Sequence, residues 1–153
     1  PSGNTLWLLT FHASPPVLDG PEDRNGKRNH DEAAFWSLYL NGEFETVPDG
    51  LFVVLGDANL DARKGNGRPE ALRALLEDPR LQDPEPRAVG GIGEAAMDTV
   101  DWPQPGPGRM RVDYVLPSSD IEVLDAGVVW PKDDATARKA SRHRLVWVDV
   151  VLP

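Results

Sequence analysis

Short apolar segments alternate with two amphipathic segments along this chain, and this alternation constrains the fold more than any other feature. Five segments have the length and the β-branched or aromatic content typical of buried strands. They span residues 6–11, 51–55, 111–116, 127–130 and 145–152. The pattern predicts an α/β domain, and we expect its strands to assemble into one sheet with helices packed on it.

Two of the segments between the predicted strands have apolar residues at helical spacing. Residues 29–42 offer Asn29 as a cap, acidic residues in the first turn and Gly42 as a stop. Residues 68–79 place Pro69 in the first turn and end at Asp78-Pro79. We predict two flanking helices here. Residues 84–108 are rich in Pro, Gly and Ala and predict a long loop, which in a compact domain is usually mobile or part of a site.

Composition limits the classes of protein to consider. With 153 residues, 40% hydrophobic and 27% charged, the chain is typical of one globular, soluble domain. Its apolar runs are far shorter than the roughly 20 residues of a membrane span. The lack of cysteine excludes disulfides, thiolate nucleophiles and zinc ribbons, but leaves the compartment open, export included. The start Pro-Ser-Gly, without Met or an apolar targeting segment, indicates a processed product or a piece of a longer protein.

The net charge of −9 argues against a surface that holds nucleic acid by neutralising phosphates. An anionic substrate would instead need a local group of cations. The segment "ARKASRHR" provides one, with Arg138, Lys139, Arg142 and Arg144 beside His143. The alternative is a solvated loop before the last strand.

Polar side chains that could take part in catalysis or binding lie at the ends of the predicted strands. His12 follows the first strand, Asp57 and Asn59 follow the second, and His143 precedes the last. A strand holds its terminal residues rigidly while the adjoining loop leaves them accessible. For Asp57 the alternative is a turn former or helix cap.

Asp113 is different because it lies within a predicted strand. Burying a carboxylate costs several kcal/mol unless it is paired. Its partner could be His143, which would form a functional pair, or one of two nearby arginines, Arg109 and Arg111, which would form a structural one.

Four segments in series resemble motifs of the endonuclease/exonuclease/phosphatase superfamily, which are metal-dependent phosphoesterases. They are "LLTFHA", "GDANLD", "RVDYVLPS" and "SRHRLVWVDV". The resemblance spans nearly the whole chain and implies that residues 1–153 are the C-terminal half of a deoxyribonuclease-like α/β sandwich, supplying one sheet with two flanking helices. Residues 12–36 further resemble a bacterial subgroup of this superfamily.

The resemblance also implies a role for each polar residue. Asp57 would orient the attacking water and take its proton, and Asn59 would hydrogen-bond the nucleophile or the phosphate. His143 would grip a phosphate oxygen, while Asp113 orients its ring and favours its charged form. His12 would contact the phosphate or the leaving group.

The resemblance further implies a divalent cation, commonly magnesium, with Asp57 and Asn59 among its ligands. The main ligand, a Glu, belongs to an N-terminal half for which this chain has no residues. Arg142 stands where family members usually carry a metal-binding Asp. A cation cannot ligate a cation, so Arg142 either weakens metal binding or, with Arg144, holds the phosphate directly.

Two function classes follow. The first is a phosphoester hydrolase, acting as a phosphodiesterase, nuclease or phosphatase. The second is a catalytically impaired phosphate-binding or structural derivative. Substrates left open are DNA, RNA, a phospholipid head group, an inositol phosphate and a small diester.

One half of a two-sheet sandwich would leave an apolar sheet face open to water. The residues expected on it are Val53, Leu55, Val112, Tyr114, Val146 and Val148. We therefore expect the chain to pair with its own N-terminal half or with a second copy, and to be inactive alone.

Overall fold

The structure is a computed structural model that describes residues 5–44, 46–131 and 135–152. Three strands form the first sheet, in the order β1-β2-β6. They are β1 (Leu6–His12), β2 (Leu51–Asp57) and β6 (Asp113–Pro117). β1 runs parallel to β2, and β6 runs antiparallel to it.

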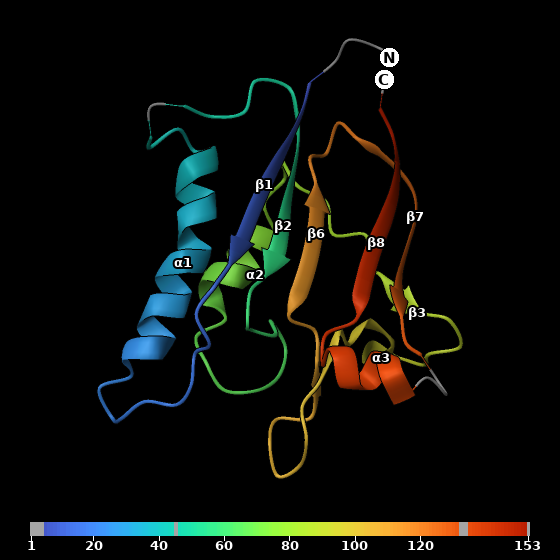
Figure 1. Cartoon of the computed structure of the whole chain (residues 1–153). Coiled ribbons are helices and arrows are strands. Elements are labelled where there is room, and N and C mark those ends of the chain that lie inside the picture. The colour runs from blue at the N-terminus through green and yellow to red at the C-terminus, as the bar shows by residue number, and fades with distance from the viewer. Residues whose placement is uncertain (1–4, 45, 132–134, 153) are drawn as a thin grey trace.

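A second three-stranded sheet has the order β3-β7-β8. Its strands are β3 (Arg87–Ala88), β7 (Glu122–Val129) and β8 (Leu145–Val151). β8 lies beside β6 of the first sheet without pairing with it (Figure 1). The α/β class is therefore confirmed, but the prediction that all strands form one sheet is wrong. A strand's own residues specify an extended, half-buried segment, whereas its pairing partner is selected by packing across the molecule.

Both predicted helices form, and they lie on the same side of the first sheet (Figure 1). They are α1 (Arg24–Leu40) and α2 (Glu70–Leu76). Their buried side chains pack with those of the sheet into the main core. Its members include Trp36, Phe52, Leu72, Leu75, Tyr114 and Leu116.

α1 begins earlier than its sequence predicts, at Arg24, with Asp23 as the preceding residue. Asn29 is therefore not a cap. It lies fully buried inside the helix and donates from Nδ2 to the backbone carbonyls of Ser14 and Ala58, at 2.7 and 2.8 Å. These two bonds tie α1 to the segments that follow β1 and β2, and this tertiary role outweighs the capping preference of Asn.

The stretch 84–108, predicted as a long loop, contains short elements of its own. Besides β3 it contains a short 3-10 helix, η1 (Glu94–Met97), and the strand β4 (Val100–Asp101), which pairs with β5 (Arg109–Met110). Met97, Thr99 and Val100 are almost completely buried. Elements this short leave no periodic signal in a sequence. A further helix, α3 (Ala135–Ala140), precedes β8.

The alternation of side chains gives the first sheet two different faces. Phe52, Val54 and Tyr114 belong to the core beneath the helices, so Val53, Leu55 and Asp57 project from the opposite face. The expected open apolar face is thus wrong in part. Tyr114 lies in the helix-covered core, Val112 in a second core cluster, and Val53 is only 6% exposed. Leu55, Val146 and Val148 are half-buried.

None of the helices in the described ranges combines the length and the apolarity that crossing a membrane requires.

Candidate active site

The strand register of the first sheet brings three predicted site residues into one row. His12 pairs with Asp57 across β1 and β2, and Asp57 pairs with Asp113 across β2 and β6. Paired residues point to the same face of a sheet, here the face opposite the helices. His12 Nε2 lies 3.4 Å from Asp57 Oδ2, with the His12 side chain 74% exposed and that of Asp57 17% exposed.

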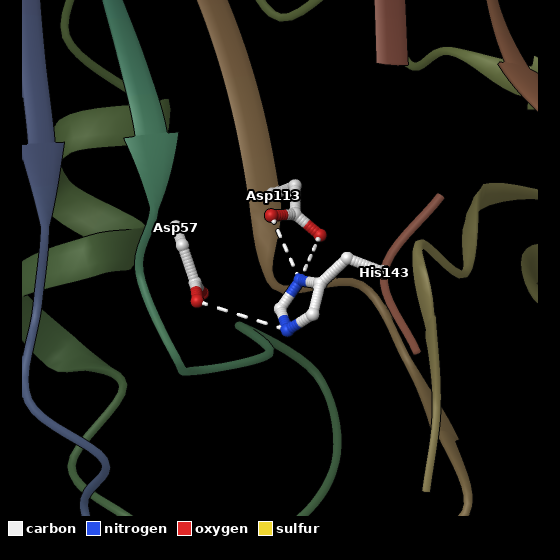
Figure 2. A group of neighbouring side chains, drawn as sticks. All are labelled: Asp57, Asp113 and His143. Carbon is white, nitrogen blue, oxygen red and sulfur yellow. Dashed lines mark hydrogen bonds and ion pairs between the residues drawn. The ribbon is translucent and has the colours of Figure 1, made fainter. Parts of the chain in front are cut away.

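His143, separated from β8 only by Arg144, lies against Asp57 and Asp113 (Figure 2). Its Nδ1 lies 3.0 and 3.1 Å from the two carboxylate oxygens of Asp113, and its Nε2 lies 3.9 Å from Asp57 Oδ2. The arginine alternatives for Asp113 are excluded, because Arg111 pairs with Asp83 and Arg109 lies nearest to Asp101. The structure thus pairs Asp113 with His143.

Asn59 reaches the row through a tight turn rather than along an extended segment. β2 ends at Asp57, and Asn59 has a φ of 48°, in the left-handed region that Asn tolerates better than most residues. Its backbone N–H donates to Asp57 Oδ1 at 2.7 Å, and its Nδ2 donates to Asp57 Oδ2 at 3.2 Å. Nδ2 also donates to the Ala13 carbonyl at 2.9 Å. The spacing Asp-x-Asn therefore builds a turn in which the amide orients the carboxylate.

Gly56 is required for this arrangement. A Cβ at this position would collide with the backbone carbonyl oxygen of Phe11 on β1. β1 and β2 can approach closely just before Asp57 only because residue 56 has no side chain.

Thr99 anchors the segments that carry Asp113 and His143. Its buried hydroxyl accepts the backbone N–H groups of Val112 and Asp113, both at 3.0 Å. Its carbonyl accepts the N–H of Arg144 at 2.7 Å. One residue thus fixes both backbone segments of the His143–Asp113 pair. Sequence reasoning missed Thr99 because it lies in the stretch predicted as a loop.

The electrostatic environment of the row shifts the pKa of Asp57. Burial raises the pKa of Asp57, and the nearby carboxylate of Asp113 raises it further. The N–H of Asn59, His143 and His12 oppose these effects without cancelling them. A carboxylate with a raised pKa is a stronger proton acceptor than an exposed one, which suits general-base chemistry.

The donor set fits part of a divalent-cation site. Ligand atoms of Asp57, Asp113 and His143 all lie within 4.8 Å of one another. Nδ1 of His143 is engaged by Asp113, however, and magnesium prefers oxygen ligands. The carboxylate of Asp57 and the amide oxygen of Asn59, which accepts no hydrogen bond from the described residues, are the better candidates. Together they supply only part of the octahedral shell that magnesium demands.

The two predicted phosphate-binding arginines lie in different environments. Arg142 is exposed, and its guanidinium forms no ion pair or hydrogen bond within the described part of the chain. Arg144 is only 8% exposed. Its guanidinium lies over the Trp130 ring at 4.7 Å and donates to the carbonyls of Ser141 and His143. This packing favours a role for Arg144 in supporting the His143 segment and leaves Arg142 as the accessible cation.

Comparison with known protein families identifies the family of this chain. The model of the Endonuclease/Exonuclease/phosphatase family matches residues 2–143. No curated protein matches the chain.

Several solved structures resemble the chain in fold. A mannosyl-6-phosphatase from Bacteroides thetaiotaomicron is 18% identical, with a TM-score of 0.60 over 95% of this chain and 51% of its own. An endonuclease/exonuclease/phosphatase family protein from the same organism is 17% identical, with a TM-score of 0.61 over 95% and 49%. A beta toxin mutant from Staphylococcus aureus with bound magnesium ions is 16% identical, with a TM-score of 0.52 over 97% and 51%.

The chain spans about half the length of these solved structures. At such identities the likeness shows the fold alone, and it confirms the deoxyribonuclease-like α/β fold predicted from the motifs. Together with the match over residues 2–143, it shows that the chain belongs to the Endonuclease/Exonuclease/phosphatase family.

Proposed function

We propose that this chain carries the general base and the phosphate-binding group of a metal-dependent phosphoester hydrolase. The observation that supports this most is the row formed by His12, Asp57 and Asp113 with His143 set against it. Four titratable groups from four separate segments converge on one sheet face at one end of the first sheet. Such convergence is typical of a catalytic site.

In the proposed reaction, the phosphate lies between Asn59, His143 and Asp57. Water attacks phosphorus, and Asp57 takes a proton from that water. The ester P–O bond breaks with its electron pair on the leaving oxygen, which takes up a proton from solvent and leaves as the alcohol. His143 holds a phosphate oxygen through Nε2 while Asp113 retains Nδ1. His12 contacts the phosphate or the leaving group from the exposed end of the row.

A magnesium ion bound at Asp57 and Asn59 would offset the negative charge that develops on the phosphate. The main metal ligand is proposed to come from outside this chain. Arg142, an exposed cation beside His143, is proposed to contact the phosphate.

We further propose that the working protein needs a second part, either its own N-terminal half or another copy of the chain. The chain spans about half the length of the solved structures that it resembles. Several large apolar side chains are also exposed on its strands, including Leu8 at 61% and Leu145 at 67%. A nucleic acid remains among the substrates to be tested.

Arg142 also supports a second candidate, a catalytically impaired derivative that binds phosphate without cleaving it. A guanidinium at a position usual for a metal ligand would exclude the cation and still attract an anion. The two candidates differ in whether magnesium is needed and whether product forms.

The test is magnesium-dependent hydrolysis of a generic phosphodiester, measured on the chain alone and on the chain with its N-terminal half. The hydrolase proposal expects activity from the combined protein and a loss of at least about 100-fold in Asp57→Asn and His143→Gln. The matched control is Asp149→Asn, which neutralises an exposed Asp on β8. Phosphate binding without hydrolysis in the combined protein would favour the impaired derivative.

A further inference from the structure

A groove of about 860 Å³ opens beside the candidate active site. One wall comes from the loop after β1, at residues 15–18. The other comes from residues 102–107, which form the tip of the β4–β5 hairpin. Met110, Asn59 and Asn66 complete the lining. The volume is within the range of small-molecule pockets, about 300 to 1,000 Å³.

The hairpin tip is held in place over this groove. Its base is closed by the pairing of Val100 with Met110, and Trp102 N–H donates to the Gly108 carbonyl at 3.0 Å. Asp101 N–H donates to the carbonyl of Arg142 at 3.1 Å, which joins the hairpin to the segment carrying His143. The Pro-rich segment 102–107 is therefore anchored at its base by hydrogen bonds and forms one wall of the groove.

The groove is continuous with the row of site residues at two points. Asn59 lines it and also bonds to Asp57. The indole of Trp102 lines it and meets the ring of His143 edge-on, with ring centroids 6.1 Å apart. A phosphate held by His143 would therefore have its ester group directed toward this groove or toward open solvent.

The lining residues define the chemistry of the occupant. None of them is charged, so the groove offers no cation to hold a second phosphate or an extended polyanion. A quaternary ammonium group would need a cage of aromatic residues or a carboxylate, and the lining supplies a single indole. What it offers is the apolar surface of Trp102 and five prolines, with the amides of Asn66 and Gln104. The Nδ2 group of Asn59 is already bonded to Asp57 and to the Ala13 carbonyl.

Resting on the proposed function, we infer that this groove binds the organic group esterified to the phosphate, and that this group is an uncharged ring with polar substituents. The flat ring of Trp102 suits the apolar face of such a ring, and the amide side chains suit its hydroxyl or amide groups. Sugar phosphates and nucleoside monophosphates share this chemistry. Trp102 is then a specificity-determining residue.

The test is an NMR titration of the full chain, following the indole N–H of Trp102 and the ring of His143. The probes are a sugar phosphate, a nucleoside monophosphate, methyl phosphate, and the two ring compounds without phosphate. The inference expects ring phosphates to shift both signals, methyl phosphate to shift only His143, and at least one phosphate-free ring compound to shift only Trp102. The tighter of the two ring phosphates identifies the source of the ring.

Trp102→Leu should weaken the binding of the preferred ring phosphate about tenfold and leave that of methyl phosphate within about twofold. The matched control is Trp7→Leu, which removes another partly exposed indole, on β1. Equal weakening of both ligands would mean that Trp102 acts only through His143, and would overturn the inference.

Failure of the groove and failure of the phosphate site give different results. If methyl phosphate shifts His143 but no ring compound moves Trp102, the groove inference is overturned while the proposed function stands. If a ring compound moves Trp102 but no phosphate moves His143, the groove stands and the proposed phosphate site fails.

Discussion

Asp57 occupies a costly position for a carboxylate. It is mostly buried at the end of β2, and the row places the carboxylate of Asp113 next to it. Burial first, and then Asp113, raise the pKa of Asp57. Residues held in such unfavourable positions are common at functional sites, where placing a reactive group lowers the folding stability of the protein.

Asp57→Asn should therefore stabilise the chain while removing hydrolysis. The folded-state pKa of Asp57 is raised above the ordinary 3.8, so its ionisation lowers the free energy of unfolding. This destabilisation is complete at any pH above the folded-state pKa. Chemical denaturation should show a gain of about 1 kcal/mol at pH 7. The gain should disappear as the pH falls below 3.8, where Asp57 is protonated in both states. A loss of stability at pH 7 would indicate a structural Asp57.

Asp113→Asn tests the His143–Asp113 pair in a different way. An amide offers Nδ1 of His143 one acceptor oxygen, whereas the carboxylate of Asp113 places two oxygens at 3.0 and 3.1 Å from it. We expect hydrolysis by the combined protein to fall by at least about tenfold, with less than about 1 kcal/mol of stability lost. Kinetics and denaturation should be measured on the same samples. Equal losses in the two measurements would contradict a functional role for the pair.

At the scale of elements, a buried ion pair fixes the segment that leads into β6. The two guanidinium end nitrogens of Arg111 donate to the carboxylate of Asp83 at 2.6 and 2.7 Å, and the guanidinium lies over the ring of Tyr114. The backbone N–H of Arg111 also donates to Asp61 at 2.9 Å. These contacts join the residues before β6 to the segments after α2 and β2.

Asp83→Asn should destabilise the chain by about 3 kcal/mol at pH 7, because it leaves the charge of Arg111 buried and unpaired. Burial alone would raise the pKa of Asp83, but the hydrogen bonds and charge of Arg111 outweigh it, and the pKa is lowered below 3.8. The stabilisation is thus full above the unfolded-state pKa and lost as the pH falls through the folded-state pKa.

Denaturation of this variant and of the unmodified chain should therefore converge in strong acid. Asp120→Asn, at an exposed position in the β6–β7 turn, serves as the control. A difference in stability that does not change with pH would contradict the ionic origin of this stabilisation.

At the scale of the whole molecule, the helices cover only one face of the first sheet. Leu8 on β1 belongs to the other face and is 61% exposed, while Leu124 on β7 and Leu145 on β8 are 63% and 67% exposed. A sheet face that carries exposed apolar residues is a candidate surface for another chain segment to cover.

We predict that the purified chain does not persist as an active monomer. Mass measurement in solution should show self-association, or complex formation when the N-terminal half is supplied, and activity should need that half. Leu8→Asp should reduce the association without unfolding the chain, because Leu8 lies outside both core clusters. A stable monomer with magnesium-dependent phosphodiesterase activity would contradict this prediction.

The sequence by itself determined most of the helices and strands and the polar residues of the candidate site. The apolar periodicity located β1, β2, β6, the end of β7, β8, α1 and α2. The motifs also singled out His12, Asp57, Asn59, Asp113 and His143. Residue type and strand ends are local properties, so they can be read from a sequence.

Only the tertiary structure decided how these parts come together. The division into two sheets, the burial of residues 96–100 and the pairing of Asp113 with His143 rather than with an arginine all depend on contacts between distant segments. Asn29 and Thr99 acquired their roles in the same way, by hydrogen bonds to backbone groups that the sequence does not place nearby. A single sequence carries the donors and acceptors, but the fold selects which of them meet.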